Sequence, residues 1–156
     1  MNTLLILTGD TDRKELRTLV ADYVGRIKHY TPFSVAEIKT HNEGLSQAEI
    51  CRREAKEIEG RLKDGDYIIL LDEHGKEFTS RELAAELQKW LLYPRGRRLV
   101  FIIGGPYGFT DELKQKAAMQ ISLSRMTFSH QMVRLIFTEQ LYRAFTIIRG
   151  EHYHHE

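Results

Sequence analysis

Residues 101–110, FIIGGPYGFT, are the first stretch of the sequence whose composition suits ligand binding. An apolar run ends there in three closely spaced glycines, as it does in loops that hold a phosphate through backbone N–H groups. However, Pro106 removes one such donor, and Asp111 and Glu112 would repel an anion from the first turn of the next helix. The stretch therefore predicts a ligand that is neutral or cationic at this point, although the glycines alone favour an ordinary turn.

The C-terminal segment EHYHHE is the second candidate, because it places three histidines close together. Their spacing is not a helical i, i+4 pair and no cysteine accompanies them, so we predict no metal site. Tyr153 among these imidazoles is instead suited to stacking on a nucleic-acid base. The helix before the tail carries three arginines that could contact phosphate, Arg134, Arg143 and Arg149. Each is also compatible with a surface ion pair, and Glu139 stands one turn before Arg143.

Composition places these candidates in a single domain spanning residues 1–156. The only cysteine, Cys51, excludes an internal disulfide and favours a reducing compartment, so we expect a cytoplasmic protein. The apolar runs are far shorter than the roughly 20 residues that span a bilayer, and the start lacks the features of a signal peptide. The net charge is +1, with −3 in residues 1–94 and +4 in residues 95–156. The C-terminal part is the better candidate for an anionic partner, although an ordinary solvated surface explains this balance equally well.

The elements that must position these groups alternate between strand and helix. Short apolar or β-branched runs predict four strands, at 4–8, 33–39, 67–71 and 99–103. Apolar periodicity and capping boxes predict helices between them, at 12–29, at 46–62 and from 79 onward. This alternation predicts an α/β fold with a mostly parallel sheet covered by helices on both sides. Ligands of such sheets bind beyond the C-terminal strand ends, where we expect the loops after 71 and 103 to meet the segment 122–130.

The last 47 residues have a different character. We predict a short helix from about 111 to 120 and a long helix from about 130 to 149, which ends at Gly150. Apolar side chains cover a wide arc of the long helix. Such a helix lies inside a large core or against a second subunit, and in a chain this small the second arrangement, a homodimer, is favoured.

Four motifs together resemble the RlmH family, small SPOUT methyltransferases that act on large-subunit ribosomal RNA. They are LLDEHGKEFTS, FIIGGPYGF, ISLSRMTFSHQMVRLIFTEQLYRAF and the terminal YHHE. The resemblance covers nearly the whole chain and is most specific over residues 101–156. Two departures stand out: Ser129 replaces a proline that is common before the histidine, and RGEHYHHE replaces a tail that usually contains a proline.

This resemblance implies a Rossmann-like sheet whose C-terminal segment forms a trefoil knot, and a homodimer. It implies S-adenosylmethionine as the cofactor, bound in the knotted loops. By position, the implied cofactor pocket consists of Leu71, Gly104, Leu123, Ser124, Arg125, Met126, Thr127 and Phe128. The implied reaction methylates N3 of a pseudouridine in 23S rRNA on assembled ribosomes, with no metal and no membrane involved.

The residues for this chemistry come from the last helix and the tail. We expect His154 to accept or relay the imino proton, because an imidazole titrates near neutral pH, and Tyr153 to stack on or orient the base. Arg134 or Arg143 would contact a phosphate or balance charge on the uracil ring. Two alternatives stay open, a non-catalytic ribosome-binding or RNA-binding module with the same fold and an unrelated nucleotide-binding α/β protein.

Overall fold

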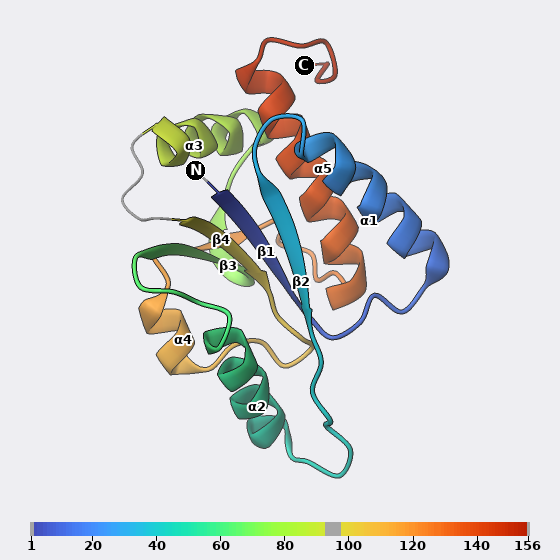
Figure 1. The fold of residues 1–156 in the computed structure, drawn as a ribbon, viewed down its shortest axis with the longest axis vertical. Coiled ribbons are helices and arrows are strands. Elements are labelled where there is room, and N and C mark those ends of the chain that lie inside the picture. Colours follow the sequence, from blue (N-terminus) through green and yellow to red (C-terminus); the bar gives the residue numbers. More distant parts are fainter. Residues whose placement is uncertain (1, 93–97, 156) are drawn as a thin grey trace.

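The structure, a computed structural model, describes residues 2–92 and 98–155 of the chain. These residues contain a five-stranded sheet in the order β2-β1-β4-β3-β5, in which every neighbouring pair is parallel (Figure 1). The strands are β1 (Asn2–Thr8), β2 (Phe33–Ile38), β3 (Asp66–Glu77), β4 (Arg98–Ile103) and β5 (Met119–Ser122). The four strands predicted from the sequence are all present, and the less buried one, β2, lies at an edge of the sheet.

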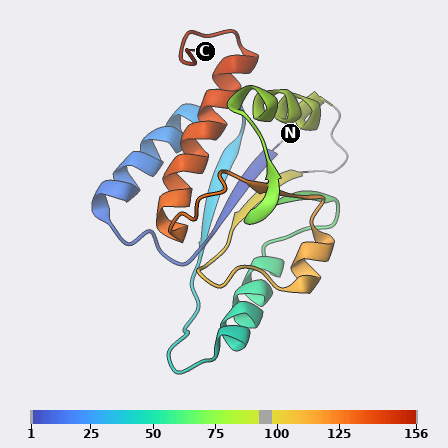
Figure 2. The ribbon, with the colours of Figure 1, turned by 180° about the vertical axis from the view of Figure 1, so that it is seen from behind.

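Helices cover both faces of the sheet, as the alternating pattern predicted (Figures 1 and 2). One face is covered by α1 (Lys14–Ile27), α3 (Ser80–Leu92) and α5 (His130–Ile148), and the other by α2 (Gln47–Glu59) and α4 (Asp111–Lys116). On the first face, Phe101 of β4 packs against Phe137 of α5 with ring centroids 4.9 Å apart. The α/β fold predicted from the sequence is therefore confirmed.

The predicted helix over 111–120 is wrong at its C-terminal end. Thr110 caps α4 by accepting a hydrogen bond from the N–H of Leu113, but the helix ends at Lys116 and β5 begins at Met119. β5 has only four residues and therefore carries too short a pattern to be recognised in the sequence. It forms because it pairs with β3, which continues to Glu77 and so includes residues predicted to be a loop.

The long helix α5 has the predicted extent, and Gly150 follows its end with a φ of +69° that favours glycine. Its core-facing side chains are buried, whereas several apolar ones beside them stay partly exposed, namely Val133, Ile136, Ile147 and Ile148. Met132 is 45% exposed. This arc is wider than the core of one chain covers.

The backbones of β3 and β5 approach each other closely where their pairing changes register. The pairing runs from Ile69 to Leu71, is interrupted, and resumes at Lys76. Within the interruption, Gly75 lies directly against the backbone of Gln120 and Ile121: a Cβ at Gly75 would come within 2.6 Å of Ile121 N. Only a residue without a side chain allows this approach.

This close approach predicts that adding a single methyl group at position 75 strongly lowers the stability of the protein. We expect Gly75→Ala to lower the free energy of unfolding by about 1–3 kcal/mol or to prevent folding, because backbone atoms of β5 cannot move aside. The matched control is Gly25→Ala in the last turn of α1, where no atom lies within 4 Å of the new Cβ. That change should stabilise the protein by about 0.5–1 kcal/mol in urea unfolding. Equal effects of the two substitutions on the free energy of unfolding would contradict the close approach of β3 and β5.

Candidate functional site

A cleft of about 550 Å³ lies beyond the C-terminal ends of β3 and β4 and beside the segment that follows β5. This is where ligands bind in open parallel sheets, and the volume suits a ligand of cofactor size. Seven of the eight predicted cofactor residues line it, namely Leu71, Gly104, Leu123, Ser124, Met126, Thr127 and Phe128. The eighth, Arg125, is exposed and is not part of the lining. The loops after 71 and 103 meet the segment 122–130 here, as expected. The cleft is also lined by residues that the sequence analysis did not assign to the cofactor pocket, including Ile103, Phe109, Ile121, Ser122 and His130.

The glycine stretch forms one wall of the cleft through a compact turn. The N–H of Gly108 donates to the carbonyl of Gly105 at 3.2 Å, and Gly108 itself has a φ of +77°. The ring of Phe109 packs over Gly104, where a Cβ would lie 3.0 Å from the ring carbons. The turn is thus fixed by local packing, and the acidic first turn of α4 follows it, so this wall remains unsuited to a phosphate.

The segment after β5 forms the opposite wall and is held by its own hydroxyl groups. Ser122 Oγ donates to the carbonyl of Ser124, whose Oγ accepts from the N–H of Met126. Thr127 Oγ1 donates to Glu73 Oε2 at 3.1 Å, which ties this segment to the irregular part of β3. These contacts hold a wall that also presents the apolar residues Leu123, Met126 and Phe128 to the cleft.

His130 lies at the start of α5 and reaches the cleft. Burial lowers the pKa of its imidazole, and the positive charge of the nearby Arg134 lowers this pKa further. A neutral imidazole can donate one hydrogen bond and accept one, so His130 adds an adaptable polar group to the apolar wall. Its half-buried position follows from the packing of α5, which the local sequence does not reveal.

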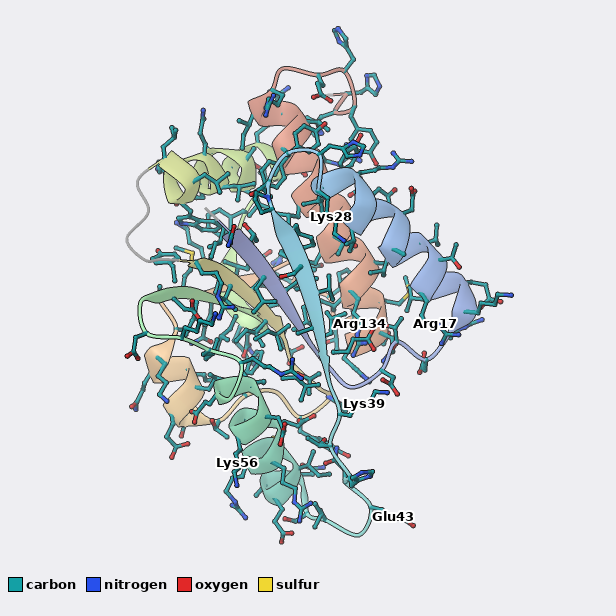
Figure 3. The ribbon with its side chains drawn as sticks, viewed as in Figure 1. Arg17, Lys28, Lys39, Glu43, Lys56 and Arg134 are labelled. Carbon is teal, nitrogen blue, oxygen red and sulfur yellow. The ribbon has the colours of Figure 1, made fainter. Side chains whose placement is uncertain are left out.

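Arg134 does not lie where the sequence analysis expected it. Its side chain is fully buried between α5 and the loop after β1 (Figure 3). Nη1 donates to the carbonyl of Gly9 and to Thr11 Oγ1, and Nη2 donates to the carbonyl of Thr8 at 2.7 Å. The predicted contact between Arg134 and RNA phosphate is therefore wrong for this chain, because the guanidinium already binds backbone inside the fold.

The other predicted catalytic residues gather at the far end of α5. Tyr153 donates its hydroxyl to Glu139 Oε1 at 3.0 Å, and Arg143 donates to the same oxygen and, through Nη1, to His154 Nδ1 at 3.1 Å. The guanidinium of Arg143 also lies over the ring of Tyr153, 4.7 Å from its centroid. Burial first, and then hydrogen bonds to Tyr23 and Glu139, raise the pKa of Tyr153. Glu139, which the sequence analysis treated only as an ion-pair partner, is at the centre of this group. We call Glu139, Arg143, Tyr153 and His154 the tail cluster.

The tail cluster and the cleft are separated along α5 within one chain. His130 and Val133 line the cleft, whereas Arg143 lies ten residues beyond Val133. At 1.5 Å per residue this spacing corresponds to about 15 Å along the helix axis. The predicted cofactor residues are therefore brought together and the predicted catalytic residues of the tail are brought together, but not the two groups with each other.

Across the described parts of the chain, no group of three or more histidine, cysteine or acidic residues could hold a metal ion. In the same residues, no helix combines the length and apolar character that crossing a membrane requires. Cys51 is a free thiol.

Comparison with known proteins gives one consistent result. A family model described as "Predicted SPOUT methyltransferase" matches residues 1–154. Proteins named ribosomal RNA large subunit methyltransferase H from Porphyromonas gingivalis and Flavobacterium johnsoniae are each 48% identical, and each alignment covers all of both chains. A solved structure of a probable methylase family protein from Haemophilus influenzae Rd KW20 has a TM-score of 0.50 at 13% identity, covering 96% of this chain and 66% of that one. The last likeness concerns the fold alone.

The two arginines of α5 should differ when replaced. We expect Arg134→Ala to lower the free energy of unfolding by at least about 2 kcal/mol, because it leaves three buried oxygen atoms without their donor and opens a cavity. Arg143→Ala removes an i, i+4 pair with Glu139 and the contacts with His154 and Tyr153, none of them fully buried, and should cost less, about 1 kcal/mol. Denaturant unfolding of both variants measures this, and a larger loss for Arg143→Ala would contradict the structural role of Arg134.

Proposed function

Because the chain belongs to the SPOUT methyltransferase family, we propose that it methylates N3 of a pseudouridine in 23S rRNA within the assembled ribosome. The observation that carries this proposal is the cleft, in which the glycine turn and the segment 122–128 face each other as two walls of one site. Full-length relatives named as large-subunit ribosomal RNA methyltransferases support the substrate class.

The donor set of the cleft fits S-adenosylmethionine. Leu71, Ile103, Leu123 and Phe128 offer apolar contact for an adenine ring, and the backbone of both walls offers hydrogen-bonding groups. When bound, this cofactor supplies an activated methyl group on a positively charged sulfur. The protein then mainly has to align that methyl group with the attacking nitrogen and exclude water.

The proposed proton acceptor, His154, must change one contact before it can act. Nδ1 of His154 accepts a hydrogen bond from Arg143, so in the neutral ring the proton sits on Nε2. Accepting a second proton therefore requires Nδ1 to separate from Arg143, which would free the guanidinium at the same time. We propose that the RNA takes over Arg143, through phosphate or the uracil ring, and so makes His154 available.

A homodimer would resolve the separation between the cleft and the tail cluster. The exposed apolar arc of α5 supplies a surface for a second copy, and the tail of one subunit would then reach the cleft of the other. We also propose that the C-terminal segment threads a loop to form the trefoil knot, which the close approach of Gly75 to Gln120 and Ile121 supports. A cytoplasmic location agrees with the substrate and with the free thiol of Cys51.

Two measurements test the function. In a calorimeter the protein should bind S-adenosylmethionine but neither NAD nor ATP, because the glycine turn offers no phosphate cradle. With tritiated cofactor it should then label ribosomes that lack the modification, and free rRNA much less. Cofactor binding without any labelling would favour the non-catalytic module, and binding of ATP or NAD alone would favour an unrelated nucleotide-binding protein.

Substitutions in the tail cluster and in the cleft should impair different steps, methyl transfer and cofactor binding respectively. We expect His154→Ala to reduce single-turnover methylation by about 10²–10⁴-fold, the usual contribution of general acid–base catalysis, with unchanged cofactor affinity. Phe128→Asp should instead abolish cofactor binding, because it places a charge on the apolar wall. A mixture of the two variants that exchanges subunits should recover activity if the tail acts on the partner's cleft. No recovery from mixed dimers would show that each chain uses its own tail.

A further inference from the structure

A buried carboxyl group lies directly behind the glycine turn, on the side away from the cleft. Glu54 of α2 is 5% exposed, and its side chain faces Gly105: a Cβ built on Gly105 would lie 2.6 Å from Oε2 and 3.1 Å from Oε1. The small space there is lined by Glu54 and by Gly104, Gly105 and Phe109, which also line the cleft. The backbone of the glycine turn therefore lies between this carboxyl group and the cleft.

This carboxyl group lacks the partners that buried acids normally have. Oε1 of Glu54 is buried and has no hydrogen-bond partner, and the space beside it is too small for a water molecule. Within residues 2–92 and 98–155 no lysine or arginine forms an ion pair with it. Burial alone raises the pKa of this group, which shows that no nearby cation offsets the desolvation.

An unpaired buried acid destabilises a fold relative to an apolar side chain of similar size, so its position calls for a partner outside the chain. A cation close to Gly105 would offset the cost of burying this carboxylate. Gly105 itself is required for this closeness, because any side chain there would collide with the carboxyl group. Cys51, one turn earlier on α2, contacts the carbonyl of Tyr107, so the same helix face also supports the turn.

We propose that Glu54 is the counter-charge for the sulfonium of the cofactor and makes the cleft prefer the charged methyl donor to the neutral-sulfur product. The proposal rests on the proposed function, because it needs a sulfonium in the cleft. The interaction acts across the backbone of Gly105 rather than by direct contact. Loss of the positive charge at methyl transfer then removes the attraction, which favours exchange of S-adenosylhomocysteine for fresh S-adenosylmethionine.

The test compares two ligands that differ in one methyl group and one charge. Dissociation constants of S-adenosylmethionine and S-adenosylhomocysteine are measured by calorimetry at pH 8 and low salt for wild type and Glu54→Gln. At an effective dielectric of about 20, a unit charge about 10 Å away changes the affinity for a cation roughly tenfold. We expect Glu54→Gln to weaken S-adenosylmethionine by about that factor and to leave S-adenosylhomocysteine within about twofold.

Two further variants make the outcome decisive. Glu57→Gln on the exposed side of α2 removes the same charge and should change neither constant. Glu54→Asp keeps the charge and should keep the preference for S-adenosylmethionine even if the shorter side chain weakens both ligands. Equal weakening of both ligands by Glu54→Gln would show that Glu54 only shapes the turn, and no weakening would show that its charge is not used. Either result overturns the proposal, whereas failure of the wild type to bind either ligand would overturn the proposed function itself.

Discussion

The parallel pairing of β5 with β3 is the interaction on which the candidate site depends. β5 has four residues, and its pairing with β3 is interrupted between Leu71 and Lys76. That interruption lets the chain after β5 lie across the end of β3, where Thr127 can reach Glu73. Without it, the segment 122–128 would have no fixed position opposite the glycine turn, and the cleft would have one wall. This arrangement requires a glycine at position 75, because a side chain there would collide with the backbone of β5.

Two buried ionisable groups show how differently the fold treats charge. The guanidinium of Arg134 has no exposed surface, but three of its hydrogen bonds go to oxygen atoms of the loop after β1. It therefore ties α5 to the end of β1 and sets the position of His130, one turn earlier and in the cleft. Glu54, by contrast, has a buried oxygen without any partner. Nε of Arg134 is also buried without a partner, but the two other nitrogen atoms of its guanidinium bind three oxygen atoms, whereas Oε1 of Glu54 has no partner and no cation paired with it among the described residues.

The sequence predicted those parts of the fold that rest on local patterns. Apolar runs identified β1, β3 and β4, and the capping pair of Thr79 and Glu82 forms both of its hydrogen bonds at the start of α3. β5 was not predicted, because four residues are too few to show an alternating hydrophobic pattern and the strand forms only by pairing with β3. Arg134 was misassigned for a similar reason: an arginine on a helix has the same local pattern whether it faces solvent or a carbonyl cluster 125 residues away.

The motifs also identified the residues of the site without revealing their distances. Seven predicted cofactor residues share one cleft because their loops follow neighbouring strands, a consequence of parallel topology that the alternation of elements already contains. The tail is different, since its position depends on where a 19-residue helix begins and ends. The predicted extent of this helix already implies a distance of about 15 Å between its cleft end and Arg143, and the structure agrees, because Val133 lines the cleft.

The C-terminal tail is held firmly against the rest of the molecule. Tyr30 donates its hydroxyl to Glu151 at 2.8 Å and stacks on Phe145, while Tyr153 packs edge-on against Tyr142 with centroids 4.7 Å apart. These contacts fix the tail on α5 and on the end of α1 before any partner arrives. The entropy of ordering Tyr153 and its neighbours is therefore lost during folding, so a partner that binds the tail would not have to order it. Since a rigid tail cannot fold back along its own helix, the same contacts that order it also keep it away from the cleft of its own chain.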